Sequence, residues 1–220
     1  AVGGVAGGVI LFTVMLDFFP AKDVIPLHGL IQIANNISRT VFGMHHVEWR
    51  IVFQYVVGAV LGALLGAQFL SGIRWDQAPL WMSIFILTAT WMPTLPRVPE
   101  PPVKFTLLGI FQTALSLFIG VTGPINIPFL LRENLPRDRV VITHAVQMTA
   151  MHVMKVITFG FLGFTLSPYL TLLGGILLAV TLGSYLGTIV RQYVPESIFR
   201  IALKWLITVL CLRLLFKALF

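Results

Sequence analysis

Residues 47–72 place the strongest limit on what this chain can fold into. From residue 51 the stretch IVFQYVVGAVLGALLGAQFLSG has no Asp, Glu, Lys or Arg, and as one helix it is long enough to cross a bilayer. Gly58, Gly62 and Gly66 recur every fourth residue, a spacing that lets helices pack closely in lipid. The whole chain is 57% hydrophobic and 10% charged, whereas soluble domains are about 25% charged. We therefore predict an all-α polytopic membrane protein.

Proline, glycine and charge divide the chain into further apolar segments. These are residues 5–18, 24–42, 47–72, 79–95, 104–119, 126–131, 139–162, 168–189 and 197–220. The stretch PTLPRVPEPPVK at 93–104 is the most Pro-rich and is the predicted linker between two halves. The predicted domains are a first transmembrane repeat at 1–96, a linker at 97–103 and a second repeat at 104–220. The net charge of +7 is scattered over turns and helix ends, which favours membrane loops over a nucleic-acid partner.

The two halves align without a gap when the sequence is shifted by 116 residues. The aligned pairs are Gly4 and Gly120, Gly7 and Gly123, Pro20 and Pro136, His28 and His144, Gly58 and Gly174, Asp17 and Glu133, and Arg39 and Lys155. Chance supplies apolar identities in such a biased chain, but not paired Gly, Pro, His and cationic positions in one register. We therefore predict an internal repeat. The counterpart of the helix at 104–119 would precede Ala1, so we expect the first helix to be incomplete in this sequence.

The topology depends on how the second half is interrupted. If the helix before the break at 120–128 and the short helix after it form a re-entrant hairpin, each half has three full spans. An odd number of spans inverts the second repeat, as in many secondary transporters. If the break is a kink in one span, the count and the orientation change. One turn contains three arginines, Arg132, Arg137 and Arg139, whereas the turn at 163–168 is uncharged. We therefore predict that the arginine-rich turn is cytoplasmic and that the uncharged turn is outside.

The break itself is a candidate anion site. Gly120, Gly123, Pro124 and Pro128 weaken a helix, and the prolines also remove backbone donors. A short helix that follows presents free N–H groups and a positive dipole end, and Thr122 and Asn126 add side-chain donors. Residues 4–8 are predicted to duplicate the break in the first half. The alternative is a kink that only helps packing.

The helix after each Gly-rich stretch has a polar stripe at helical spacing. The stripes comprise His28, Gln32, Asn35, Asn36 and Arg39 in the first half, and His144, Gln147, Met148, His152 and Lys155 in the second. A charge near the bilayer centre costs at least roughly 2.5–3.5 kcal/mol, so these side chains are expected to face an interior. Neither stripe contains an acid, and Asp17 and Glu133 are the candidate counter-charges. Two uncompensated cations beside helix N-termini indicate an anionic substrate, although both could instead snorkel to the interface.

Other functions are less well supported by the residues. His144, Met148 and His152 have a spacing that permits a metal site, but no carboxylate or cysteine joins them. The chain has no H-E-x-x-H, G-x-S-x-G or P-loop motif, so neither an enzyme nor direct use of ATP is expected. No cofactor is indicated. A channel or a non-transporting membrane subunit remains a further alternative.

The two Gly-rich stretches, the linker and the polar helices resemble the TauE/SafE family of membrane permeases, also called the sulfite exporter family, over essentially the whole chain. The most typical parts are G-V-T-G-P-I-N-I-P-F-L at 120–130 and H-A-V-Q at 144–147; in the first half, G-G-V-A-G-G at 3–8 and the polar helix from His28 correspond. The resemblance implies two inverted repeats of membrane helices and ion-coupled carriage of sulfite, sulfoacetate or related organosulfur anions. The first half departs from the pattern because no proline follows its Gly-rich stretch within residues 9–16.

Taken together, the sequence predicts a multi-pass carrier of the plasma membrane for a small sulfur oxyanion. Arg39 and Lys155 would supply charge, and His28 and His144 are candidates for proton coupling, with sodium as the other possible coupling ion. The sequence does not indicate an oligomeric state. The predicted substrate-binding residues are Gly7, His28, Asn35, Asn36, Arg39, Thr122, Gly123, Asn126, His144, Gln147, His152 and Lys155.

Overall fold

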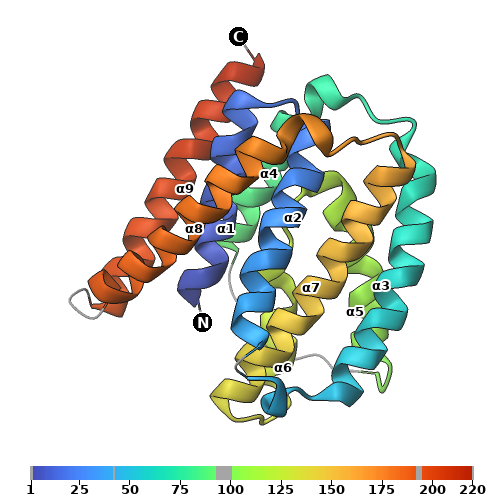
Figure 1. Cartoon of the computed structure of the whole chain (residues 1–220), viewed down its shortest axis with the longest axis vertical. Helices are drawn as coiled ribbons and strands as arrows, with labels where there is room; N and C mark the ends of the chain where they lie inside the picture. Colours follow the sequence, from blue (N-terminus) through green and yellow to red (C-terminus); the bar gives the residue numbers. More distant parts are fainter. Residues whose placement is uncertain (1, 42, 93–100, 192–194, 220) are drawn as a thin grey trace.

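The computed structural model describes residues 2–41, 43–92, 101–191 and 195–219, and every regular element in these ranges is helical. The α-helices are α1 (Val2–Phe18), α2 (Ala21–Thr40), α3 (Trp49–Leu70), α4 (Ala78–Trp91), α5 (Lys104–Ile119), α6 (Ile127–Leu131), α7 (Arg137–Phe161), α8 (Leu170–Arg191) and α9 (Glu196–Leu219) (Figure 1). Short 3-10 turns lie at Met44–His46, Trp75–Gln77, Gly123–Asn126 and Ser167–Tyr169. The predicted all-α class is confirmed. Residues 97–100 of the predicted linker lie outside the described residues.

Proline determines where the two polar helices begin. Pro20 and Pro136 each occupy the position before the first residue of α2 and α7, with φ values of −57° and −53°. A proline here leaves no helical hydrogen bond unmade, because the first N–H groups of a helix have no partner within it. The predicted starts at 24 and 139 were therefore a few residues late.

The break in the second half turns the chain back on itself. α5 ends at Gly120, whose φ of +79° lies in the left-handed region that glycine tolerates. The 3-10 turn and α6 then return toward the start of α5, where Lys104 forms an ion pair with Glu133. This pair favours the hairpin over a single kinked helix.

The predicted break in the first half is wrong. α1 runs as one helix from Val2 to Phe18, straight through Gly7 and Gly8. A glycine costs a helix only about 1 kcal/mol relative to alanine, whereas a proline costs about 3 kcal/mol and removes a donor. The first half has glycines in this position but no proline, so its helix continues.

The helices pack around two hydrophobic cores. Core A draws mainly on α1, α2, α4 and α9, and includes the buried residues Phe12, Leu27, Met82 and Cys211. Core B joins α3, α5, α6 and α7. Each core takes helices from both sequence halves, so the two predicted repeats interlock rather than pack as separate units.

α3 and α5 approach closely because glycines line their contact. A Cβ atom at Gly58 or Gly62 would collide with the backbone of Thr106 or Ile110, and one at Gly109 would collide with the backbone around Tyr55. The predicted role of the four-residue glycine spacing is thus seen in core B. Gly174, the shift-related partner of Gly58, has open space around it.

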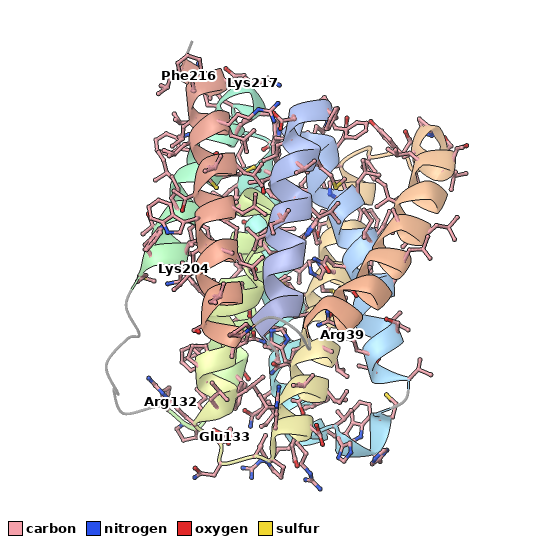
Figure 2. All side chains as sticks on the ribbon, turned by 90° about the vertical axis from the view of Figure 1, so that its left-hand side faces the viewer. Arg39, Arg132, Glu133, Lys204, Phe216 and Lys217 are labelled. Carbon is pink, nitrogen blue, oxygen red and sulfur yellow. The ribbon has the colours of Figure 1, made fainter. Side chains whose placement is uncertain are left out.

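The two polar helices, α2 and α7, lie side by side and run in opposite directions (Figure 1). The acids that precede them lie at opposite ends of the molecule. Asp17 is near the end that carries Lys217, and Glu133 is at the other end (Figure 2).

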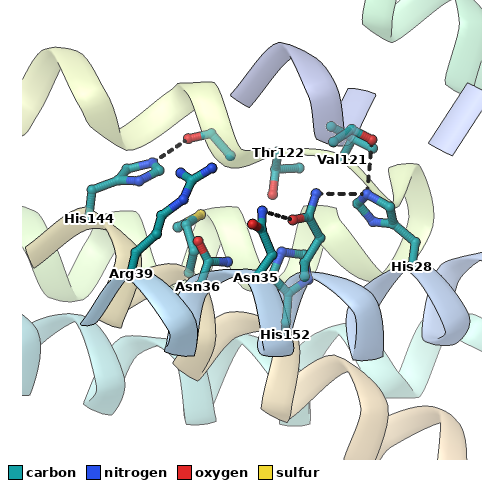
Figure 3. Close-up of a pocket in the computed structure, with 12 residues that line it drawn as sticks. His28, Asn35, Asn36, Arg39, Val121, Thr122, His144 and His152 are labelled. Atoms are coloured by element: carbon teal, nitrogen blue, oxygen red, sulfur yellow. Dashed lines mark hydrogen bonds between the residues drawn. The ribbon is translucent and has the colours of Figure 1, made fainter. Parts of the chain in front are cut away.

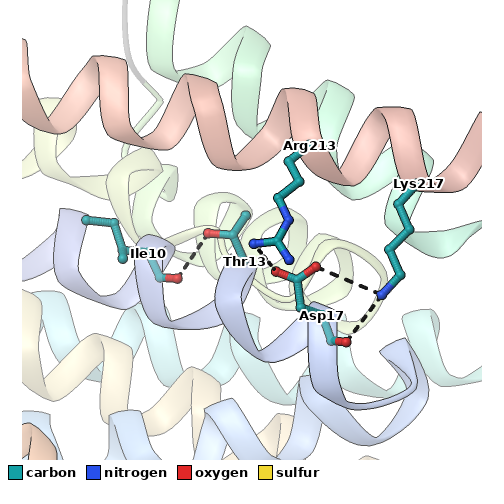
Figure 4. Close-up of polar contacts among 5 residues, drawn as sticks. All are labelled: Ile10, Thr13, Asp17, Arg213 and Lys217. Atoms are coloured by element: carbon teal, nitrogen blue, oxygen red, sulfur yellow. Dashed lines mark hydrogen bonds and ion pairs between the residues drawn. The ribbon is translucent and has the colours of Figure 1, made fainter.

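Asp17 and Glu133 do not neutralise the cations of the polar stripes. The Asp17 carboxylate lies 3.4 Å from Arg213 Nη1 and 3.9 Å from Lys217 Nζ, both on α9 (Figure 4). Glu133 pairs with Lys104. The suggestion that these acids are counter-charges for Arg39 and Lys155 is therefore wrong, because distant helices bring other cations to them.

Two helices among the described residues, Trp49–Leu70 and Arg137–Phe161, are long and apolar enough to cross a bilayer, by length and composition. Three shorter apolar stretches lie at Gly7–Phe18, Lys104–Ile119 and Ser167–Ala179. Many apolar side chains on the outer helix faces are exposed, including Phe53, Leu64, Phe69 and Leu178. This pattern suits a surface that faces lipid.

Candidate functional site

A pocket lies between α2, α7, the middle of α1 and the break after α5. Its cavity volume is about 40 Å³, taken as the space that the centre of a water-sized sphere can occupy. Its lining consists of Gly8, His28, Gln32, Asn35, Asn36, Arg39, Val121, Thr122, Gly123, His144, Met148 and His152. Figure 3 shows His144 and Arg39 at one end of the pocket and His28 at the other, with Thr122 and Asn35 between them. Of its lining residues, Val121 belongs to core A and Met148 to core B, so the pocket lies between the two cores.

The two shift-related histidines make the same kind of contact. His28 Nε2 lies 3.0 Å from the carbonyl oxygen of Gly8, and His144 Nε2 lies 3.1 Å from that of Gly123. A carbonyl only accepts, so each ring donates from Nε2. The Nδ1 atom of His28 is buried and has no protein partner. Each imidazole thus ties a polar helix to the glycine-rich stretch of its own half.

Amide side chains continue the polar wall along α2. Asn35 Nδ2 donates to Gln32 Oε1 at 3.2 Å. Gln32 Nε2 lies 3.1 Å from His28 Nε2, and with the proton of that ring nitrogen directed to Gly8 the two nitrogens are both donors and do not bond to each other. Asn36, on the same helix, is buried and also lines the pocket. These groups supply donors and acceptors at fixed positions on one helical face.

Arg39 is the charged side chain of the lining. It is half-buried and reaches from α2 toward His144 (Figure 3). None of the described residues that line the pocket is acidic, and no described carboxylate lies within ion-pair distance of Arg39. The positive charge therefore faces the pocket without a counter-charge among the described residues.

Lys155 lies behind the pocket wall rather than in it. Its side chain is fully buried, and Nζ donates to the carbonyl oxygen of Gly120 at 2.6 Å. Gly29 of α2 packs against this segment, since a Cβ there would lie at ordinary contact distance from Lys155 Cδ, 3.5 Å, and tightly at 3.2 Å from Val156 Cγ2. The lysine predicted to touch substrate thus caps the end of α5.

Two further predicted residues hold the break to α7. Asn126 Nδ2 donates to Gln147 Oε1 at 2.8 Å, and both side chains are fully buried. Neither lines the pocket. Their remaining atoms, Asn126 Oδ1 and Gln147 Nε2, have no hydrogen-bond partner.

Thr122 lines the pocket, but its hydroxyl is already engaged, at 3.4 Å from the Gln112 carbonyl and 3.3 Å from Met151 Sδ. Gln112 in turn donates to the Thr122 carbonyl at 2.7 Å and accepts from Tyr55 at 2.8 Å. A chain of buried hydrogen bonds therefore fixes the break against α3 and α5.

The structure changes the list of residues around the site. Gly7 is exposed and faces away, and its neighbour Gly8 lines the pocket instead, because α1 is unbroken. Gln32 and Met148 join the lining and could have been found, since both lie on the predicted stripes. Val121 also joins it, and nothing in its residue type points to such a role.

The Asn126–Gln147 contact makes a testable prediction about stability. Asn126→Ala leaves the Gln147 amide buried without any partner, which is expected to cost about 1–3 kcal/mol. Thermal unfolding of the detergent-purified protein measures the loss. The double variant Asn126→Ala/Gln147→Ala should be less destabilised than the sum of the single variants, because it removes both partners. Additive effects would show that the contact contributes nothing.

The metal alternative places His144, Met148 and His152 in the same pocket. His144 is turned to the Gly123 carbonyl, and Met148 Sδ lies 3.8 Å from Gln112 Nε2. Among the residues described, no group of three or more His, Cys, Asp or Glu has an arrangement suited to a metal ion. The pocket geometry thus gives this alternative no added support.

Comparison with known proteins identifies the family of the chain. The family model described as sulfite exporter TauE/SafE matches residues 1–214 of the 220. No match was found among curated proteins or among solved structures. The resemblance inferred from the Gly-rich motifs is confirmed. The chain belongs to the TauE/SafE sulfite exporter family, whose members are membrane transporters of sulfur-containing anions.

Proposed function

We propose that this protein is a secondary transporter of a small sulfur oxyanion, sulfite or an organosulfonate such as sulfoacetate, and that it works by alternating access. The observation that carries the proposal is the charge of the pocket. Arg39 faces it, three imidazoles and three amides surround it, and none of its described lining residues is acidic. An anion bound there would provide the counter-charge that none of the described residues supplies.

The chemistry of the lining suits an oxyanion. A sulfite or sulfonate group has three oxygens that accept hydrogen bonds, and the guanidinium of Arg39 offers donors in a planar fork. The Asn35 and Asn36 amides and the Gln32 amide can donate to the remaining oxygens. We assign direct substrate contact to these residues. Thr122, Gly123, Asn126 and Gln147 would shape the site, and His28, His144 and His152 would flank the anion.

The position of the pocket supports alternating access. It lies where core A meets core B, and the shift-related helices α2 and α7 cross it in opposite directions (Figure 1). Rocking of one core against the other would open the pocket first to one side and then to the other. Two inverted repeats, at 1–96 and 104–220, would give the two states similar packing energies. The protein would be a multi-pass protein of the plasma membrane, with the turn at 132–139 on the cytoplasmic side.

Transport of radiolabelled sulfite by proteoliposomes tests the proposal. Vesicles containing the protein are expected to accumulate sulfite with saturable kinetics, and unlabelled sulfoacetate should compete for uptake. Protein-free vesicles correct for passive entry, and phosphate and chloride test the specificity for sulfur oxyanions. If sulfite and sulfoacetate enter at the protein-free rate, the proposed function is wrong.

A further inference from the structure

Lys155 is the most deeply buried cation among the described residues. Because it does not line the pocket, direct contact with the transported anion does not explain why a charge is buried there. Its side chain has no exposed surface, and its ammonium contacts the Gly120 carbonyl at 2.6 Å. In the part of the chain that the structure describes, no carboxylate lies within ion-pair distance of it. A buried charge without a partner is costly, so its retention calls for an explanation.

The location of the ammonium is informative. Gly120 is the residue at which α5 stops, and the carbonyl groups at the end of a helix have a partial negative charge. In transporters built from interrupted helices, unwound carbonyls and helix C-terminal ends bind the coupling cation. Here a covalently attached cation occupies such a position.

We propose that the Lys155 ammonium is a tethered cation that stands where a coupling sodium ion would otherwise bind, and that its proton is the ion coupled to anion transport. This inference rests on the anion transport proposed above, and it assigns the coupling ion of the same site. The sequence made His28 and His144 the candidates for proton coupling, but both rings are bonded to glycine carbonyls. We assign the coupling role to Lys155 instead.

The surroundings of Lys155 link the proton to the anion. The titratable groups that face it are His28 from α2 and His152 from its own helix, and both line the pocket. α5 and the break present the Gly120 carbonyl to it. With an anion in the pocket, the ammonium has a nearby counter-charge. When the anion leaves, the buried charge loses that compensation, so anion and proton favour each other's binding.

The proton transfer is balanced within one cycle. The neutral amine of Lys155 accepts a proton from water on the side where the anion enters, using its nitrogen lone pair. After the anion departs to the other side, one N–H bond breaks and the proton passes to pocket water beside His28 and His152. The amine keeps N–H groups that can still donate to the Gly120 carbonyl, so the end of α5 stays capped.

The test compares net transport with exchange in sodium-free proteoliposomes containing a trapped pH indicator. Sulfite and sulfoacetate are both offered for uptake, and proton entry is measured with sulfoacetate, because bisulfite carries its own dissociable proton into the vesicle. Wild-type vesicles are expected to acidify internally as the anion enters, and added sodium should change neither rate. In Lys155→Met, anion exchange at equal pH and saturating anion should persist, with a higher KM because the ammonium no longer favours anion binding, whereas anion-dependent acidification is lost. Lys22→Met, an exposed lysine on α2, is the matched control and should behave as wild type.

The outcomes separate this inference from the proposed function. If neither anion is transported by the wild type, the proposed function fails first. If transport requires sodium, or if Lys155→Met still acidifies, the tethered-cation role is wrong. Loss of exchange in a variant that elutes and melts like the wild type would instead make Lys155 a substrate contact and also overturn it. If Lys155→Met does not fold, Lys155→Arg provides the test. Because arginine stays protonated, this variant should exchange the anion but should not release a proton, so it should show no anion-dependent acidification.

Discussion

Replacing Arg39 by alanine is expected to lower the initial rate of sulfite uptake about 10- to 100-fold at subsaturating substrate. Hydrogen bonds to a charged group contribute about 1.5–3 kcal/mol each, and the oxyanion would lose its charged partner in the lining. Arg39 has no described carboxylate partner in the protein, so its removal leaves no acid exposed and the fold is expected to stay intact. Uptake of radiolabelled sulfite by proteoliposomes, with a melting curve of each variant, measures the two effects separately.

Arg74→Ala is the matched control, since Arg74 is an exposed arginine paired with Asp76 far from the pocket. It should transport at the wild-type rate. Arg39→Lys should retain part of the activity, because lysine keeps the charge but not the planar fork that matches an oxyanion. If Arg39→Ala is folded and transports normally, Arg39 is not the substrate's counter-charge, and the charge argument for the pocket fails.

The sequence was most informative about features that a single helix determines. The predicted starts of α2 and α7 fell only a few residues after the observed ones, which directly follow Pro20 and Pro136, and the break at Gly120 was visible because prolines follow it. Helical spacing placed His28, Asn35 and Asn36 on one face of α2, and the structure brings that face to a pocket. These features were predictable because the relevant physics lies within about one turn of the residue itself.

Features that depend on what lies opposite a helix were not predictable. The stripe on α7 contains both His152 and Lys155, yet one lines the pocket and the other caps α5. Which of the two faces the substrate depends on how α5 ends against α7. Likewise, nothing in the sequence pairs Asp17 with Arg213, because the contact joins the first helix to the last.

The interrupted helix shows a third limit. A Gly-rich stretch in a sequence suggests an interrupted helix, but only proline removes a backbone donor and clashes with the preceding turn. α1 therefore continues where residues 120–128 do not. The two halves therefore differ more in structure than the predicted repeat suggests. The difference lies beside the pocket, where the second half is interrupted and α1 is not.

The two shift-related glycines, Gly58 and Gly174, should respond in opposite ways to the same substitution. In Gly58→Ala the new Cβ would collide with the carbonyl group of Thr106, and backbone on both sides leaves little room for adjustment. Overpacking of a tight core costs about 1–3 kcal/mol, occasionally more, and we expect a loss near the upper end of that range. Gly174→Ala places its Cβ in open space on α8, so it should be neutral or should stabilise the helix by up to about 1 kcal/mol.

Thermal unfolding of both variants in the same detergent measures this contrast, with size-exclusion chromatography as a check on the folded state. The two substitutions are chemically identical and lie at positions that the shift of 116 residues aligns, both within helices, so helix propensity cancels between them. What remains is the contact that α5 makes with α3 in core B. If Gly58→Ala melts like the wild type, the close approach of α3 and α5 is wrong, and with it the placement of the break beside the pocket. If Gly174→Ala is as destabilised as Gly58→Ala, a helix packs against α8 in the folded protein as closely as α5 packs against α3.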